Sequence, residues 1–442
     1  MSELKRNIGT FGAASVGIAN IIGAGIFVLS GVATGIAGPA VILSFLIAGV
    51  IAMLTALSAA ELSSFITDTG ASYAYTKRAF GRFWSFLVGW FKYFDYMVGG
   101  AAVSVGFAAY FTSMFGLEGA LPMLLAAIGL PIILGLLNIL GVKEATRTTS
   151  VMVLIKIFAI SLLLMFGGFY LTQHFDVDHY TPFFATGFGG MLSGAAVIFF
   201  VFIGFNTVTM MSEETKNPQK TIPKALMLAF AITFVLYMCI AVILVGILDW
   251  HDETKDAHPL GSIASVISDN QMFFDFISFS ALIAAGSVVL SSLLGGTRAS
   301  FAMGRDRLLP HQFEKISKRF GTPYVSIIVG CLIIVIFAGL FYNNIDVIAS
   351  IVNFGSLFTY LFVNLALIKL RRSEPKTQRL FKVPIYPVVP ILGAASCIGL
   401  MYFLSDSAKI VSLVYAVIGL ALYFFVFRKT KSTTKDNNQN NI

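Results

Sequence analysis

Apolar residues dominate this chain in long runs that are separated by short polar connections. About twelve runs are long enough to cross a bilayer as a helix, which takes roughly 20 residues. They cover residues 8–34, 38–65, 84–113, 119–141, 149–171, 188–211, 222–248, 272–297, 324–343, 345–370, 385–404 and 407–427. The pattern predicts an all-α integral membrane protein with about 12 transmembrane helices.

Two of these runs carry glycine near their centre. The first reads Ile21-Ile22-Gly23-Ala24-Gly25-Ile26-Phe27, and the second reads Phe202-Ile203-Gly204-Phe205-Asn206. Glycine weakens a helix by roughly 1 kcal/mol relative to alanine, so both runs are expected to break there. In lipid, a break is tolerated only where protein or a water-filled cavity satisfies the freed backbone groups. Interrupted spans at matching places in two halves of a chain are typical of a transporter binding site.

Positive charge is concentrated in the connections on one side of the predicted membrane. With both termini placed inside, only Lys255 and Lys409 fall in outside segments, and Lys92 and Lys156 lie within spans. This distribution follows the positive-inside rule and predicts cytoplasmic N- and C-termini in a multi-pass plasma-membrane protein. The net charge of +8 therefore reflects orientation and contact with membrane lipids, and does not indicate a nucleic-acid partner.

Composition agrees with the membrane prediction and argues against catalytic chemistry. Hydrophobic residues make up 57% of the chain and charged residues 12%, against roughly 25% charge in soluble domains. The cysteines lie in apolar spans without metal-ligand or disulfide spacing, and all histidines fall in connections. The chain also lacks a phosphate-binding glycine loop followed by Lys-Ser/Thr. We therefore expect no enzyme activity, no cofactor and no metal.

The order of the spans suggests two inverted repeats. A repeat with an odd number of spans inverts its second copy, so breaks in spans 1 and 6 would meet near the bilayer midplane. We expect a first five-helix repeat in residues 1–171, a second in 188–370, two further helices in 385–427 and a disordered cytoplasmic tail in 428–442. The longest outside connection, about 249–271, is expected to hold a short lid helix.

Four motifs occur in order along these spans. Gly23-Ala24-Gly25-Ile26-Phe27 lies in span 1, residues 69–81 precede span 3, residues 212–223 follow span 6, and residues 305–310 follow span 8. Together they resemble the amino acid–polyamine–organocation (APC) superfamily, which has the LeuT-type fold, over nearly the whole chain. Within it the chain is similar to prokaryotic proton-coupled amino acid permeases related to cationic amino acid transporters. The resemblance implies a 5+5 inverted repeat, broken helices 1 and 6, and two extra C-terminal helices.

The break in helix 1 is the candidate site for a substrate carboxylate. Unwinding exposes N–H groups at the start of the outer half-helix, where about half a positive charge favours an anion. The alternative is close packing of small residues between helices, which the pairing with a second break makes less favoured. The candidate residues, acting through their backbone, are Gly23, Ala24, Gly25 and Ile26.

The break in helix 6 exposes carbonyl groups that can accept hydrogen bonds from a substrate ammonium. Phe200, Val201 and Ile203 are the candidates for these carbonyls, with Gly204 as the hinge. Each phenylalanine taken singly is better explained by core or lipid packing. The candidates for walling or gating the side-chain pocket are Phe199, Phe202 and Phe205.

Lys156 is predicted to carry proton coupling. A lysine within a span costs a few kcal/mol unless it is paired or neutral, so it indicates a function by default. In LeuT-type sodium symporters a sodium ion lies between helices 1 and 8, and some proton-coupled relatives place a helix 5 lysine there. Lys156 matches that position, so its ammonium would brace helix 1 and its deprotonation would release that brace. The alternative is a side chain that snorkels to the inner interface.

Acidic residues in or near the spans leave two interpretations open. Asp95 corresponds to the place where the cationic amino acid transporters carry a helix 3 glutamate, so it could be a second proton carrier or partner of Lys156. It lies at i, i+3 spacing from Lys92, and a structural ion pair explains it equally well.

Solvated salt bridges at inner helix ends are expected for the remaining candidate acids, Glu61, Glu213 and Glu214. Serines of helix 8 (Ser287, Ser291 and Ser292) are better explained by bonds to their own backbone.

The predicted function is secondary active uptake of amino acids by proton symport and alternating access. The first alternative is an amino acid exchanger without net proton coupling, and a non-transporting amino acid sensor is a third reading. Ala24 stands where a hydroxyl could bind substrate, and Asn206 follows the second break without an adjacent acid. We therefore expect neutral, mainly apolar substrates with broad specificity. The sequence does not indicate an oligomeric state.

Overall fold

The computed structural model describes residues 8–66, 71–140, 145–210, 215–250, 258–317, 320 and 322–439. Within these ranges the chain is almost entirely helical. Parts of two sequence motifs, residues 69–70 and 212–214, lie outside the described residues, as do Lys255 and both Glu213 and Glu214.

Helices occupy all twelve predicted apolar ranges, which confirms the all-α membrane fold. Ten of these ranges hold one continuous helix each: α3 (Val41–Ser63), α5 (Arg82–Met114), α6 (Ala120–Leu140), α7 (Ala145–Gln173), α10 (Pro218–Ile247), α12 (Gln271–Arg305), α13 (Tyr324–Leu340), α14 (Ile345–Ser373), α15 (Val388–Phe403) and α16 (Asp406–Gln439). The first range is divided between α1 (Thr10–Ile21) and α2 (Gly25–Ala37). The sixth is divided among α8 (Gly187–Ile198), the 3-10 segment η3 (Phe199–Phe202) and α9 (Asn206–Met210).

Short helices connect the spans at both ends of the molecule. They are η1 (Gly38–Ala40), α4 (Ser72–Phe80), η2 (Asp178–Tyr180), α11 (Pro259–Ile267) and η5 (His311–Glu314). α11 lies in the connection where the sequence predicted a short helix, and it packs against α2, α7 and α12. Leu260, Ile263 and Ala264 of α11 are completely buried, so this helix covers the bundle rather than lying free above it.

Nine helical segments in the described ranges are long and apolar enough to cross a membrane by themselves. This number is lower than the twelve predicted apolar ranges for a structural reason. α1 has 12 residues because the chain breaks after it, and α2, η1 and α3 follow one another without an intervening loop and form one continuous segment. α13 and α15 are apolar but have only 17 and 16 residues.

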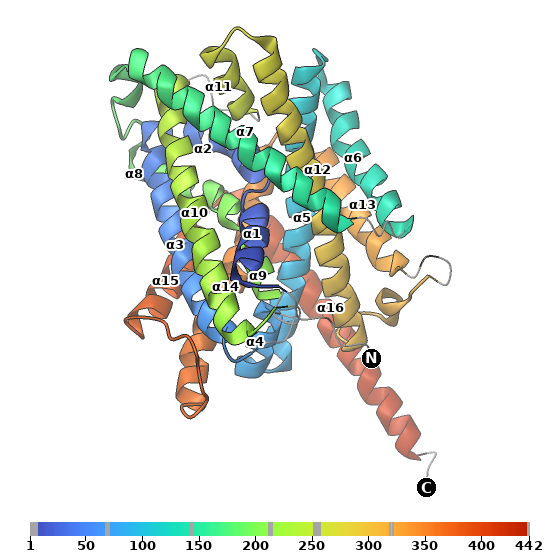
Figure 1. Ribbon diagram of the computed structural model, residues 1–442. Coiled ribbons are helices and arrows are strands. Elements are labelled where there is room, and N and C mark those ends of the chain that lie inside the picture. The colour runs from blue at the N-terminus through green and yellow to red at the C-terminus, as the bar shows by residue number, and fades with distance from the viewer. Residues whose placement is uncertain are drawn as a thin grey trace.

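The core is formed by helices that are buried on all sides. α2 is buried along nearly its whole length, as expected for a helix that is hydrophobic around its circumference. α5 packs against α12 and α14, and α7 runs obliquely across the bundle (Figure 1). α6, by contrast, exposes Leu121, Ile133 and Leu140 at 55% or more, which places it at the lipid-facing perimeter. α2 and the end of α8 next to the second break thus lie in the interior of the molecule.

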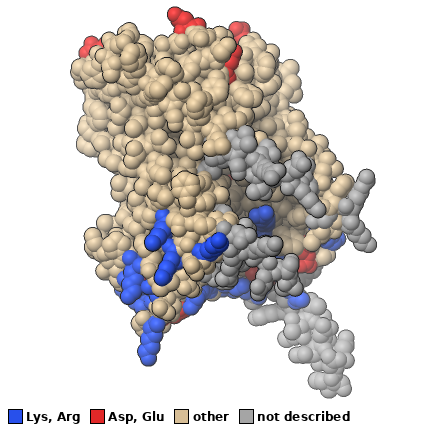
Figure 2. Space-filling view, viewed as in Figure 1, with Lys and Arg blue, Asp and Glu red and all other residues tan. Residues whose placement is uncertain are grey.

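The two ends of the molecule differ in charge. Figure 2 shows Lys and Arg gathered toward the lower end of one face and acidic side chains at the upper end. α1 begins and α16 ends toward the basic end (Figure 1). The basic residues there come from α4, from the start of α10 and from the end of α14 and the loop after it: Lys77, Arg78, Lys220, Lys224, Lys369, Arg371, Arg372 and Lys376.

Glu61 corrects one sequence-based expectation. It was expected to form a solvated salt bridge, but it is 0% exposed at the end of α3. Arg371 of α14 donates two hydrogen bonds to its carboxylate, at 2.7 and 2.5 Å, and the backbone N–H of Val383 donates a third at 2.6 Å. The guanidinium of Arg379 lies 3.4 Å away. The sequence could not show this burial, because the loop after α14 folds back over the helix end.

The C-terminal segment 428–442 was predicted to be disordered. α16 is bounded by Asp406 and Gln439 and so includes part of that segment. Extending an existing helix requires no new nucleus, so a polar segment can remain helical where it directly follows an apolar span.

Candidate functional site at the two helix breaks

The first broken helix is interrupted where the sequence predicted. α1 ends at Ile21, and Ile22 leaves the helical region with ψ of 65°. The N–H of Gly23 turns back to donate to the carbonyl of Ile21 at 2.7 Å. α2 then begins at Gly25 without a side-chain cap, and its first residues are buried. The positive end of the α2 dipole therefore points into the interior of the protein.

The second broken helix unwinds in two stages. α8 tightens into η3, and Ile203 is extended with ψ of 134°. Its N–H donates to the carbonyl of Phe200 at 3.0 Å. Gly204 follows with φ of +134°, a conformation that is essentially restricted to glycine. The backbone at this predicted hinge position therefore requires glycine.

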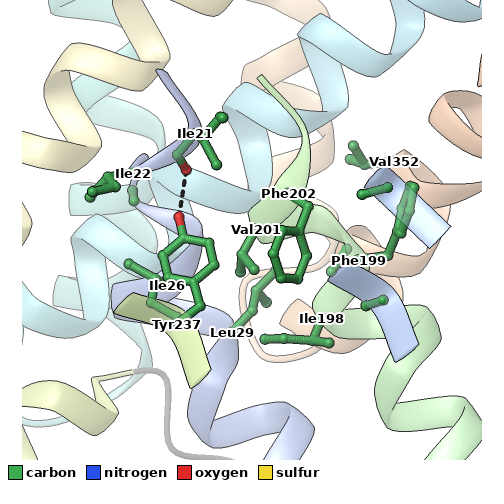
Figure 3. Packing of buried hydrophobic residues seen from close by; sticks show 14 of the residues in the cluster. Ile21, Ile22, Ile26, Leu29, Ile198, Phe199, Val201, Phe202, Tyr237 and Val352 are labelled. Carbon is green, nitrogen blue, oxygen red and sulfur yellow. Dashed lines mark hydrogen bonds between the residues drawn. The ribbon is translucent and has the colours of Figure 1, made fainter. Parts of the chain in front are cut away.

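The two breaks contact each other across the bundle. A Cβ atom on Gly204 would lie 2.7 Å from the carbonyl oxygen of Asn20 and 3.1 Å from the nitrogen of Ile21. A Cβ atom on Gly25 would lie 2.8 Å from Cδ1 of Phe200. Close packing and helix breaking, which the sequence left as alternatives, therefore occur together at these glycines. Figure 3 shows the side chains of the two segments facing one another.

Polar side chains that sequence analysis did not select anchor the broken ends. Tyr237 of α10 donates its hydroxyl to the carbonyl of Ile21 at 2.6 Å (Figure 3). Asn353 of α14 donates to the carbonyls of Ala196 and Val197 in α8, at 2.6 and 2.9 Å. A tyrosine or asparagine in the middle of an apolar span was the available signal, since buried polar groups in lipid need partners.

The predicted pocket phenylalanines are core residues in this structure. Phe199, Phe202 and Phe205 are each 0% exposed. Phe202 packs edge-on against Tyr237, with ring centroids 5.3 Å apart, and Phe205 packs against Tyr360 at 5.1 Å. In this structure these three rings pack in the core, as the sequence analysis favoured for each phenylalanine taken singly.

Phe200 is the ring that lies against the helix 1 break. It is partly exposed, unlike its aromatic neighbours, and its edge approaches Gly25. A Cβ atom on Gly99 of α5 would lie 3.8 Å from Cε2 of Phe200 and 3.8 Å from Cγ1 of Val352 of α14. Gly25, Gly99, Phe200 and Val352 thus surround one small apolar region beside the start of α2.

Lys156 is buried close to the same break. Its residue is 2% exposed in α7, and its ammonium donates to the hydroxyl of Ser287 on α12 at 3.4 Å. The next residue, Val288, places a methyl group 3.3 Å from where a Cβ of Gly23 would stand. The lysine is therefore inside the bundle. It contacts Ser287 of α12, and the adjacent residue Val288 contacts the helix 1 break. Ser287 also donates to its own helix backbone at Ala284, as expected.

Asp95 has different surroundings. Its carboxylate accepts from the ammonium of Lys92 at 2.5 Å and from the hydroxyl of Ser356 on α14 at 2.7 Å. Its side chain is 3% exposed, and that of Lys92 is 12% exposed. The structural ion pair, one of the two readings left open by the sequence, is thus present and faces α14.

Two broken helices that meet inside an apolar bundle are the arrangement of a multi-pass membrane transporter. The profile of the amino acid permease family matches residues 8–427. The chain therefore belongs to the amino acid permease family, whose members are membrane transporters, and the predicted membership of the APC superfamily is confirmed.

Individual relatives cover almost the entire chain. The branched-chain amino acid permease of Bacillus subtilis (strain 168) is 34% identical, with 97% of this chain and 94% of the relative covered. The methylthioribose transporter of the same organism is 33% identical over the same shares of the two chains, 97% and 94%. The vacuolar cationic amino acid transporter 4 of Arabidopsis thaliana is 32% identical, with 84% of this chain and 64% of the relative covered.

Proposed function

We propose that this protein is a secondary active transporter that takes up neutral amino acids together with protons. The observation that carries the proposal is the burial of Lys156 against Ser287, whose neighbour Val288 contacts Gly23 at the helix 1 break. An ionisable group buried within a span is costly and is retained where it serves a substrate or proton pathway.

The substrate carboxylate would bind the start of α2. The N–H groups of Ala24, Gly25 and Ile26 lie at an uncapped, buried helix start, where an anion is favoured. The N–H of Gly23, the fourth predicted donor, already donates to the carbonyl of Ile21. The ammonium would bind carbonyls freed by η3. Because the carbonyl of Phe200 already accepts from Ile203, the carbonyls of Val201 and Ile203 become the preferred candidates for the ammonium.

The neighbouring apolar region supports neutral substrates over cationic ones. Gly99, Phe200 and Val352 present only hydrogen, ring and methyl groups there. A cationic side chain would need an available acid, and Asp95 is already neutralised by Lys92. The similarity to a branched-chain amino acid permease agrees with an apolar region at this position. The methylthioribose relative makes this neutral thioether a necessary competitor in any substrate panel.

Proton coupling would act through the charge on Lys156. When protonated, its ammonium would brace the bundle beside Gly23 in place of a coupling cation. Loss of the proton would remove that brace and allow α1 to move. Because protonation would accompany loading from outside and deprotonation would accompany release inside, an inward proton gradient would drive uptake. Asp95, the second predicted carrier, has a structural explanation and is not needed in this scheme.

The arrangement of the helices supports two repeats and a defined orientation. α10 packs on α1 and α3 packs on α8, which is the reciprocal contact that an inverted repeat would produce for residues 1–171 and 188–370. α1 and α9 also pack together, as do α2 and α8. The basic end of the molecule would face the cytoplasm under the positive-inside rule, in a plasma membrane. Alternating access would then rock the broken helices against α5 and α12.

Transport assays in liposomes test the proposal. Purified protein would be supplied with labelled leucine, alanine, arginine or methylthioribose under an inward proton gradient, an inward sodium gradient or neither. The proposal predicts accumulation of leucine or alanine only with the proton gradient. Movement that requires unlabelled amino acid inside the liposomes would establish the exchanger instead. Binding without any movement would favour the sensor.

A further inference from the structure

A shallow groove lies at the basic end of the molecule, away from the helix breaks. It is formed where α4 meets the end of α14 and has a volume of about 530 Å³. Its lining residues are Phe80, Leu365, Ile368, Lys369, Arg372 and Ser373.

The α14 side of the groove has a division of polarity along a single helix face. Positions 365, 368, 369 and 372 have i, i+3, i+4 and i+7 spacing, so they lie on one stripe. Leu365 and Ile368 occupy the turn nearer the bilayer centre, and Lys369 and Arg372 occupy the next turn toward the basic end. This order matches the change from hydrocarbon to headgroups at a membrane surface.

The two groove cations differ from the basic residues next to them. Arg371, between them in sequence, points inward to the buried carboxylate of Glu61, and Arg78 binds Glu374. Lys369 and Arg372 are exposed, and among the described residues neither forms an ion pair with a carboxylate. The ammonium of Lys369 lies 4.8 Å from the ring centroid of Phe80, at the groove wall. Their charge is thus available to an external anion.

Aromatic residues mark the level of this groove in the membrane. Trp84 at the start of α5 is 40% exposed, and its ring lies 5.1 Å from that of Phe362. Phe80 packs edge-on against the same Phe362 at 5.8 Å. Exposed tryptophan beside Lys and Arg is typical of the membrane–water interface, where the headgroups lie.

We propose that this groove binds one anionic phospholipid from the leaflet at the basic end, the inner leaflet in the orientation above. The phosphate would lie between Lys369 and Arg372, because a guanidinium can donate two parallel hydrogen bonds to phosphate oxygens. One acyl chain would follow Phe80, Leu365 and Ile368. The charge and the apolar lining together favour a lipid over a soluble phosphate, because a soluble phosphate would contact only the charged residues.

Native mass spectrometry of the full-length protein in detergent tests the site. Phosphatidylglycerol or phosphatidylcholine would be titrated onto the protein, and the affinity of the first retained lipid would be compared. We expect a preference for phosphatidylglycerol that falls about 25-fold in the K369Q/R372Q double variant, at roughly five-fold per cation. The variant I368W, which keeps both charges but fills the apolar part, should weaken binding of the first lipid as well.

The matched control removes the same charge elsewhere at the basic end. Lys220 and Lys224 are exposed at the start of α10, and neither lines the groove. The K220Q/K224Q variant should retain the wild-type preference. If both double variants lost the preference for phosphatidylglycerol equally, general surface charge would explain it, and the proposed lipid site would be wrong. Unchanged affinity in K369Q/R372Q would overturn it directly.

Discussion

At the scale of single residues, the proposed proton-coupled transport depends most on Lys156. Its side chain is buried within a span, and its ammonium contacts Ser287, beside the residue that touches Gly23. A fixed structural cation and a proton carrier would have the same position. They differ in one respect, because only the carrier must lose its charge during each cycle.

Substitution of Lys156 by arginine separates these two roles. Arginine keeps the positive charge but is not deprotonated in proteins, so K156R should fold and bind substrate yet lose proton-driven accumulation by at least about ten-fold. K156M, which removes the charge, should lose it as well. The measurement is liposome uptake of leucine with and without a proton gradient, alongside counterflow exchange. Wild-type accumulation by K156R would assign Lys156 a purely structural role.

Glu61 supports a prediction about stability rather than transport. The variant E61Q would leave Arg371 and Arg379 without their buried carboxylate, and removing one partner of a buried pair costs roughly 3–5 kcal/mol. We expect a lower thermal unfolding midpoint by several degrees, measured by fluorescence-detected gel filtration in detergent. An unchanged midpoint would contradict the proposed role of this cluster.

Glu374 offers the matched control for Glu61. It pairs with Arg78 on the surface, with side chains 28% and 41% exposed, so E374Q should change the midpoint little. The hydrogen bonds from Arg78 lower the pKa of Glu374. Any stabilisation by this pair is therefore present above the ordinary glutamate pKa and is lost only as the pH falls through the lowered value.

At the scale of the elements, the sequence located both helix breaks because two spans at matching places in the two halves of the chain carry glycine near their centre. Gly23, Gly25 and Gly204 lie where the helices stop. What the sequence missed depends on neighbours distant along the chain. Phe199, Phe202 and Phe205 were candidates for walling or gating the pocket, and only the packing of α5 and α14 shows that Phe200 lies against the break. Tyr237 became recognisable as an anchor only when α10 was placed beside α1.

The break in helix 6 can be tested by restoring a side chain. In G204A the new Cβ would lie 2.7 Å from the Asn20 carbonyl and would hold alanine at a positive φ, at a cost of roughly 1–3 kcal/mol from the backbone alone. We expect little folded protein, or protein that no longer transports. Folded yield and leucine uptake would be measured together with G399A, whose Cβ would meet nothing within 4 Å. Normal transport by G204A would show that this hinge tolerates a side chain.

At the scale of the whole molecule, the apolar pattern was sufficient to predict twelve helical ranges and their separation by short loops. The charge pattern predicted the basic end that Figure 2 displays. The burial of Glu61 was not predictable, because it depends on the loop after α14, which folds over the helix end and donates the N–H of Val383.

The most direct test of proton symport measures the movement of protons rather than the uptake of substrate. Purified protein would be placed in liposomes that contain a pH-sensitive dye, with equal pH on both sides and no other gradient, and leucine would be added outside. Proton symport through Lys156 predicts acidification of the interior that depends on leucine and is absent in K156R. Leucine entry at the same rate without any change of internal pH would contradict proton symport and leave exchange or uncoupled transport as the function.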